Sequence, residues 1–165
     1  MPVTATSRLA IITDNVRVLV ASTAKFQTLT GTGSAAAAKE FVHLNAVNAE
    51  TFPYAIVTPG EVSDEDRTLG SATAVHTWTV EFVDEIATAN AADDVHDDAY
   101  NAFVNDFGDV LDQMQTLGKS GGGYIGPLLS VNPGPIERTK REETASRGEL
   151  IIWPIELTVR MSHGV

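Results

Sequence analysis

Two stretches of the chain repeat apolar residues at helical spacing. In the first stretch, Ser7 can serve as an N-cap and apolar residues then recur every three or four positions. This spacing predicts a helix over about residues 7–23. The stripe of apolar residues consists of Leu9, Ile12, Val16, Leu19 and Val20.

The second helical stretch is longer. Asp93 or Asp94 can cap a helix over about residues 95–117, and Gly118 ends it. The stripe of apolar residues consists of Ala99, Phe103, Phe107, Val110, Met114 and Leu117. Asp93, Asp94, Asp97 and Asp98 crowd its start, where the helix dipole stabilises negative charge.

Alternating patterns predict three strands, over residues 52–58, 74–83 and 149–161. The alternation is between large and smaller residues in the first strand, and it is strict in the last. Trp78 lies in the second strand and Trp153 in the third, each within the apolar half of the pattern, so we expect both on buried faces of a sheet. Pro154 cannot donate a ladder hydrogen bond, which predicts an edge or a bulge at that position.

Weaker signals divide the rest of the chain. Residues 25–30, 40–45 and 124–131 are predicted as short strands. Pro59-Gly60 predicts a turn, and the acidic run 61–67 a loop. Residues 31–38, a run of Gly and Ala, predict a mobile loop, which is either ordered by partners or a tolerated surface insertion. A turn at 132–135 and a charged hairpin tip over 136–148 complete the series.

The order of these elements is helix, strands, helix, strands. It predicts an α+β fold in which two α-helices pack on a mostly antiparallel β-sheet. The 165 residues hold no internal repeat and no linker, so we expect a single domain over 1–165, with a flexible loop near 31–38 and a charged hairpin near 132–148.

Charge then narrows the range of partners. The chain has 22 acidic and 11 basic residues, a net charge of −11, which disfavours tight binding to nucleic acid. A smooth acidic surface would instead let DNA pass without adhering. The longest apolar stretch, Leu150–Ile155, is far shorter than a membrane span, and Arg8 alone precedes the first apolar run, so we expect neither a membrane segment nor a secretory signal.

Candidate catalytic motifs do not meet their structural requirements. Gly118-Lys119-Ser120 resembles part of a phosphate-binding loop, but Gln113 stands where that loop needs glycine and the motif follows a helix. The four histidines, at 43, 76, 96 and 163, form no metal-ligand pair, and cysteine is absent. The sequence therefore predicts no enzyme, no metal site and no cofactor.

One local cluster of charge is a candidate contact site. Arg138, Lys140, Arg141 and Arg147 surround the predicted hairpin, within an acidic chain. They either contact an acidic neighbour, such as another copy of this chain, or form a solvated hairpin balanced by nearby glutamates. These eight charged residues are the predicted subunit contacts: Arg138, Lys140, Arg141, Arg147, Asp93, Asp94, Asp97 and Asp98.

Several strings in this order resemble the tail terminator (tail completion) proteins of long-tailed bacteriophages. The strings are SRLAIITDNVRVLVAS, FPYAIVTPGE, HTWTVEFV, DDVHDDAYNAFVNDFGDVLDQMQTLG and the closing WPIELTV. The resemblance covers nearly the whole chain in order and length. The run at 31–38 and the long segment 132–148 depart from leaner members of that family.

The resemblance implies a non-enzymatic virion protein that forms a ring, hexameric in the family, on the tail tube. Such a ring ends tube polymerisation, joins the head-closure or neck protein, and lets genomic DNA pass through its channel. It also implies a location in the virion tail or neck, after assembly in the host cytoplasm. The alternatives are another head–tail connector, such as a neck or tail-tube subunit, or a small α+β ligand-binding domain or enzyme.

Overall fold

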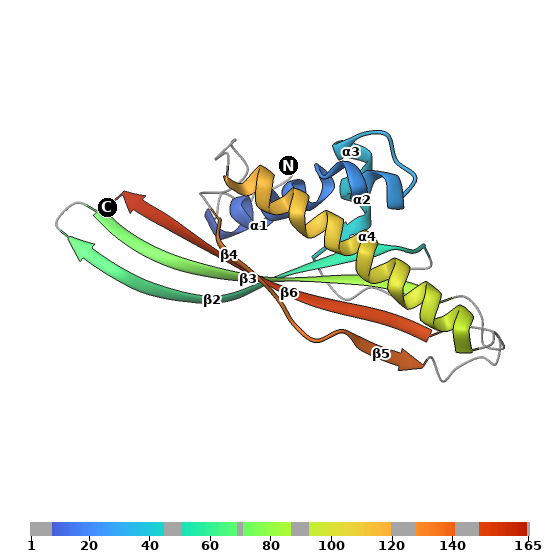
Figure 1. The fold of residues 1–165 in the computed structure, drawn as a ribbon. Coiled ribbons are helices and arrows are strands. Elements are labelled where there is room, and N and C mark those ends of the chain that lie inside the picture. Colours follow the sequence, from blue (N-terminus) through green and yellow to red (C-terminus); the bar gives the residue numbers. More distant parts are fainter. Residues whose placement is uncertain are drawn as a thin grey trace.

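The molecule has two layers, with helices on one face of a single long β-sheet (Figure 1). The computed structural model describes residues 8–44, 51–68, 71–86, 93–119, 128–140 and 149–164. In chain order, the elements are α1 (Arg8–Ala21), α2 (Ala24–Leu29), α3 (Ala35–Ala38), the 3-10 helix η1 (Lys39–Phe41), β1 (Val42–His43), β2 (Tyr54–Thr68), β3 (Ser71–Ile86), α4 (Asp93–Lys119), β4 (Leu128–Pro133), β5 (Glu137–Lys140) and β6 (Glu149–Gly164).

The sheet confirms the predicted α+β class. Its strands run in the order β1-β2-β3-β6-β4, and β5 also pairs with β6. Only the short β1 is parallel to its neighbour; every other described pair is antiparallel. The strands β2, β3 and β6 continue past the helices as a three-stranded arm (Figure 1).

The number of helices was wrong: four α-helices are described, against two expected. Most of residues 25–30 belong to α2 and not to the predicted strand. The prediction failed because the periodicity of a six-residue run cannot distinguish a helix from a strand. The one fully buried side chain of α2, Phe26, packs against the core. The second half of the predicted loop 31–38 is helix α3, whose N-cap Ser34 accepts a hydrogen bond from the Ala37 amide at 3.2 Å.

The turn expected at Pro59-Gly60 and the loop over 61–67 were also wrong. Both belong to β2, which pairs with β3 as far as Thr68. Pro59 pairs with Trp78, and a register shift between Pro59 and Val62 places Gly60 in a bulge. Gly60 passes so close to β3 that an added Cβ would lie 2.9 Å from the Thr77 carbonyl oxygen. Glycine is therefore required at this crossing for lack of space.

Near the end of the chain, β5 lies within the segment expected to be a hairpin tip, and Asn132 and Pro133 belong to β4 and not to a turn. The edge or bulge expected at Pro154 is not found, because β6 is an inner strand and pairs with β3 through Pro154 without a register shift. A gap between β4 and β5 lies beside this position instead. The Gly134 amide donates to the Pro154 carbonyl at 2.8 Å, and β4 ends there before β5 begins. Since the N–H and C=O of one strand residue point to the same side, the missing Pro154 amide falls at this gap.

The main core lies between the helices and the sheet. The predicted stripes of both long helices are buried there, wherever their side chains are described, except that Ala99 and Leu117 are half-buried. Trp78 is fully buried, as predicted, and its indole Nε1 donates to Thr13 Oγ1 of α1 at 3.2 Å. Trp153 lies on the same face but is only half-buried. A second, smaller cluster of Tyr54, Ile56 and Val83 lies on the opposite face.

Candidate functional site

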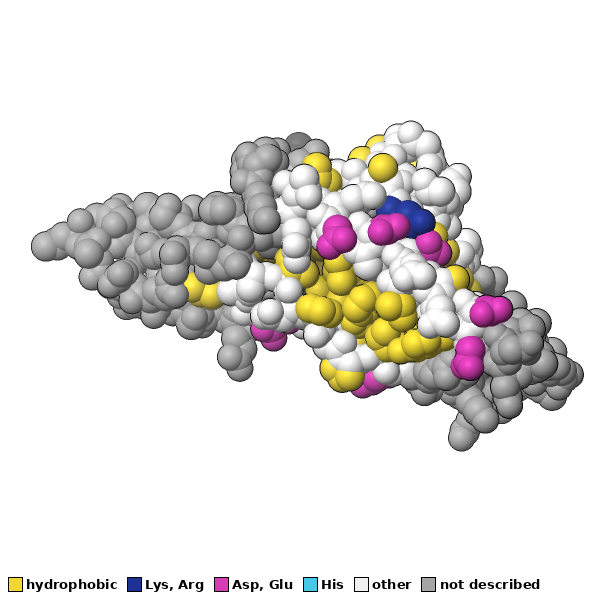
Figure 2. Space-filling model, in the orientation of Figure 1, with side chains coloured by type: hydrophobic (Ala, Val, Ile, Leu, Met, Phe, Trp, Pro, Cys, Tyr) yellow, Lys and Arg dark blue, Asp and Glu magenta, His cyan; other side chains and the backbone are white. Residues whose placement is uncertain are grey.

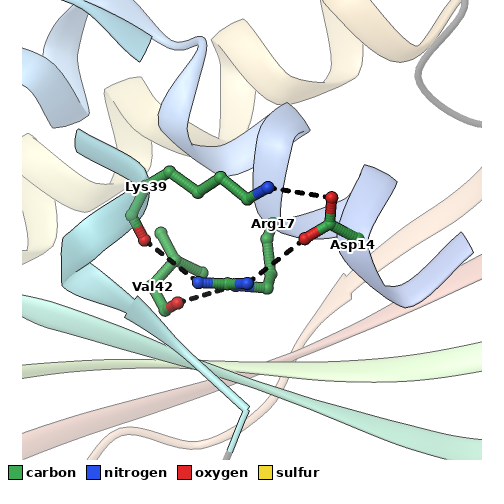
Figure 3. A network of polar contacts seen from close by, with 4 residues as sticks. All are labelled: Asp14, Arg17, Lys39 and Val42. Atoms are coloured by element: carbon green, nitrogen blue, oxygen red, sulfur yellow. Dashed lines mark hydrogen bonds and ion pairs between the residues drawn. The ribbon is translucent and has the colours of Figure 1, made fainter. Parts of the chain in front are cut away.

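A polar network ties α1 to the segment that leads into β1 (Figure 3). Arg17 donates from Nε to the Val42 carbonyl at 2.8 Å and from a terminal nitrogen to the Lys39 carbonyl at 3.4 Å. Asp14 accepts from Arg17 at 3.2 Å and from Lys39 Nζ at 2.8 Å. We call Asp14, Arg17, Lys39 and Val42 the clamp. It fixes the outermost strand of the sheet against the first helix.

An exposed apolar side chain, that of Leu44, lies two residues after the clamp residue Val42. His43 follows Val42, and its ring meets Tyr54 edge-on at 5.7 Å. Burial and the neighbouring Arg17 charge lower the pKa of His43. Leu44 comes next and is 45% exposed, the only large apolar side chain so exposed among the residues described. Leu44 is therefore an exposed apolar side chain directly after the edge strand β1, and we call it the Leu44 knob.

A second polar junction joins α2 to α4. Lys25 Nζ lies 2.7 Å from Asp106 and 3.8 Å from Asp109, and its amide donates to Gln113 Oε1 at 2.9 Å. The hydrogen bond with Asp106 raises the pKa of Lys25. Nearby on β3, burial raises the pKa of Asp84, the Asp106 charge adds to that effect, and a hydrogen bond from the Glu85 amide opposes it.

Aromatic rings form a row from the core towards the surface. Ring centroids are 6.4 Å apart for Phe26 and Phe82, 4.8 Å for Phe82 and Phe107, and 4.6 Å for Phe107 and Phe103. Phe103 then meets Trp153 at 6.4 Å. Offset and tilted packing of this kind is favourable. The row places the half-buried Trp153 on rigid support at the molecular surface.

Trp153 forms the floor of an open groove between α4 and β4, which we call the α4–β4 groove. Its volume is about 360 Å³. The lining residues are Val104, Asn105, Gly108, Asp109, Leu111, Asp112, Gln115, Val131, Pro133 and Trp153. Figure 2 shows apolar side chains gathered along this seam, with acidic side chains around them. The indole Nε1 of Trp153 already donates to the Gly134 carbonyl at 3.0 Å, so the ring offers an apolar surface.

The structure places the predicted contact residues in two elements at one end of the molecule (Figure 1). Asp93, Asp94, Asp97 and Asp98 occupy the start of α4, where Asp97 and Asp98 are exposed. Arg138 and Lys140 lie on β5, opposite Ile151 and Glu149 of β6. The predicted Arg141 and Arg147 lie outside the described residues.

Sequence reasoning missed the clamp, the Leu44 knob and the α4–β4 groove. In the clamp, Arg17 reaches the backbone carbonyls of Lys39 and Val42, 22 and 25 positions away, and backbone carbonyls carry no sequence signal. The contact between the side chains of Lys39 and Asp14 also spans 25 positions. The groove had a signal in the sequence, because Val104 and Leu111 are apolar residues off the main stripe of α4 and Gly108 lies between them. A second, narrower apolar face of this kind indicates a second contact.

In the described part of the chain, no three His, Cys, Asp or Glu side chains gather in a way that could hold a metal ion. Likewise, none of the described helices is long and apolar enough to cross a membrane.

The comparisons with known proteins differ in their outcome. No protein-family model matches the sequence. No curated protein matches it either. Among solved structures, the fold is similar to a chain in the virion of a native gene transfer agent particle, with a TM-score of 0.44 and 16% sequence identity over 98% of this chain and 100% of that chain.

Proposed function

We propose that this protein is a structural component of a phage-type virion and that it forms a ring, hexameric by resemblance, on the tail tube. The ring ends tube growth, joins the neck, and lets DNA pass through its centre. The sequence strings quoted above support this class. Under this proposal the protein acts by binding other subunits and not by catalysis, and the α4–β4 groove and the exposed Leu44 are surfaces for such contacts.

The observation that carries the proposal is the chemistry of the helix-free face of the sheet. Strand alternation and register place Thr58, Thr79, Glu156 and Asn132 in one row across four strands. A neighbouring row holds Thr77, Thr158 and Ser130. No described side chain in this central region is a Lys or Arg.

Such a face suits the wall of a channel for DNA. Hydroxyl groups keep this face wetted, while Glu156 and Glu81 repel phosphates, so none of the described side chains of this central region would hold a duplex by its charge. The helices cover the other face and are free to meet outer components. A two-layer subunit of this kind forms a ring when neighbours join edge to edge.

The proposed stop in growth follows from the geometry of addition. Head-to-tail addition of tube rings has no intrinsic end, because each added ring recreates the same surface. A terminator must match the tube on one face and refuse tube subunits on the other, and mismatched charge is one means of refusal.

Electron microscopy of particles produced without this protein tests the proposal. We expect tails of uncontrolled length that do not join DNA-filled heads. Normal tails joined to full heads would contradict it. Growth of the purified protein into tubes would instead identify a tail-tube subunit.

A charge reversal tests the channel wall separately. Glu156→Lys should slow or stall DNA delivery from otherwise normal particles, because it introduces a cation where the duplex passes. Glu156→Gln is the matched control, since it removes the charge without attracting phosphate. Equal delivery by wild type and Glu156→Lys particles would place the channel elsewhere.

A further inference from the structure

The α4–β4 groove is an unfilled apolar site on a rigid base. Trp153 at its floor is supported by Phe103 and fixed by its hydrogen bond to Gly134. Leu111 and Val131 contribute apolar walls, and the acids Asp109 and Asp112 form part of the rim. Aromatic floors with a polar rim are typical of the centres of protein interfaces.

Gly108 in the wall of the groove is not required by packing within the described part of the subunit. It lies in the middle of α4, where glycine costs a helix about 1 kcal/mol relative to alanine. An added Cβ would meet no atom of the described residues within 4 Å, so their packing does not require its small size. A glycine that intramolecular packing does not need is explained by the close approach of another chain.

The complementary feature lies at the opposite edge of the sheet. Leu44 projects just after β1, and β1 and β4 are the two ends of the strand order. Leu44 is apolar and extended from a segment that the clamp holds firmly, so little freedom is lost when it is bound. Two cations lie beside this segment, Arg17 on α1 and Lys39 on η1, and both form ion pairs with Asp14 of α1. With Glu40, the next residue, these four charges sum to zero, whereas the chain as a whole carries a net charge of −11.

We propose that Leu44 of one subunit occupies the α4–β4 groove of the next subunit, an inference that rests on the ring of the proposed function. A knob at one sheet edge and a groove at the other give a heterologous contact, which closes into a ring when the rotation between neighbours permits. In this contact the Leu44 side chain covers Trp153. The segment around Leu44 has balanced charges, so the acidic rim of the groove does not repel it as it would repel the acidic surface of most of the chain.

The absence of cysteine from the sequence permits a direct test. Leu44→Cys and Gln115→Cys are combined in one chain and treated with a short bismaleimide, both in concentrated protein and in intact particles. We expect a ladder of covalent dimers, trimers and larger species on a denaturing gel. Each single-cysteine chain is the matched control and should give almost no product, because equivalent residues do not meet in a heterologous contact.

The outcomes separate this contact from the ring itself. Native mass spectrometry of the wild type, together with microscopy of particles, reports whether a closed ring exists. A ring without the Leu44–Gln115 ladder overturns this contact and leaves the proposed function intact. Absence of any ring, alone or in particles, overturns the proposed function. Dimers from Leu44→Cys alone would show a symmetric pair and also overturn the contact.

Two further variants test the contact without cross-linking. Leu44→Asp should weaken self-association by about tenfold or more, the size expected for loss of a buried apolar anchor. Leu44→Met, of similar volume, should associate nearly as well as wild type. Gly108→Leu fills the groove from inside the subunit, so it should also block association while the melting temperature stays level or rises. Unchanged association of Gly108→Leu would overturn the contact.

Discussion

The indole Nε1 of Trp78 and the hydroxyl of Thr13 form a hydrogen bond of 3.2 Å inside the core, where both residues are buried. This bond joins the centre of β3 to α1. It satisfies a donor that would otherwise be buried without water, which is costly.

Thr13→Val should destabilise the protein by about 1–3 kcal/mol, because it keeps the shape of the side chain but removes the acceptor of the Trp78 donor. Trp78→Phe should also destabilise, through lost volume. A double-mutant cycle by urea unfolding measures the coupling. The double variant should lose less than the sum of the two single losses; strict additivity would show that the bond contributes nothing.

Arg17→Lys should loosen the clamp although it keeps the positive charge. A lysine cannot reproduce the planar fork that contacts Val42, Lys39 and Asp14 together. We expect faster amide hydrogen exchange at residues 39–44 and a modest loss of stability. Lys39→Arg, which can still reach Asp14, is the control. Equal amide exchange at residues 39–44 in both variants would show that the guanidinium of Arg17 is not what holds this segment.

Two glycines should respond to alanine with opposite signs. Gly108→Ala should stabilise the subunit by about 0.5–1 kcal/mol, since the methyl group has space and the helix gains propensity. Gly60→Ala should destabilise it, because a Cβ would lie 2.9 Å from the Thr77 carbonyl oxygen. Thermal unfolding of the two variants at neutral pH compares them. A loss of stability in Gly108→Ala would contradict the open groove.

Asp84→Asn should stabilise the fold at neutral pH. The raised pKa of Asp84 means that the folded state disfavours its charge, so this residue lowers stability once the pH is above the unfolded value of 3.8. The asparagine can still accept from the Glu85 amide. The gain should shrink as the pH falls through the folded pKa and vanish below 3.8, where both states are protonated. Urea unfolding at several pH values checks this, and a gain independent of pH would contradict it.

The sequence predicted the parts of the fold in which burial and periodicity agree. The stripes of α1 and α4 and the alternation around Trp78 and Ile155 each repeat over several turns or residues, and all are core. The prediction failed where tertiary pairing overrides a local signal. Pro59-Gly60 has the residues of a turn, but β2 pairs with β3 both up to Pro59 and again from Val62, so the chain continues as a strand with a bulge after Pro59. Phe26 is a single anchor, too little to reveal a helix of six residues.

The candidate site was predicted less completely than the fold. Charge clusters such as Asp93–Asp98 are visible in sequence, whereas the groove needs α4 and β4 to be brought together from distant parts of the chain. Leu44 is one apolar residue among many until the fold shows that it is exposed. A contact surface built from segments that are distant in the sequence has no sequence motif. Reasoning from charge clusters therefore selected the charged residues at 93–98 and 138–147 and not the groove or Leu44.

Pro154 has a consequence for how this chain can vary. Pro154 has no amide hydrogen to donate at the gap between β4 and β5. Residues 135 and 136 could therefore form no ladder hydrogen bond with the Pro154 nitrogen even if β4 and β5 were one continuous strand. The two strands are therefore registered independently against β6, one beyond Pro154 and one before it. Insertions or deletions at this gap should leave both registers unchanged, which makes it a place where related chains can differ in length without refolding the sheet.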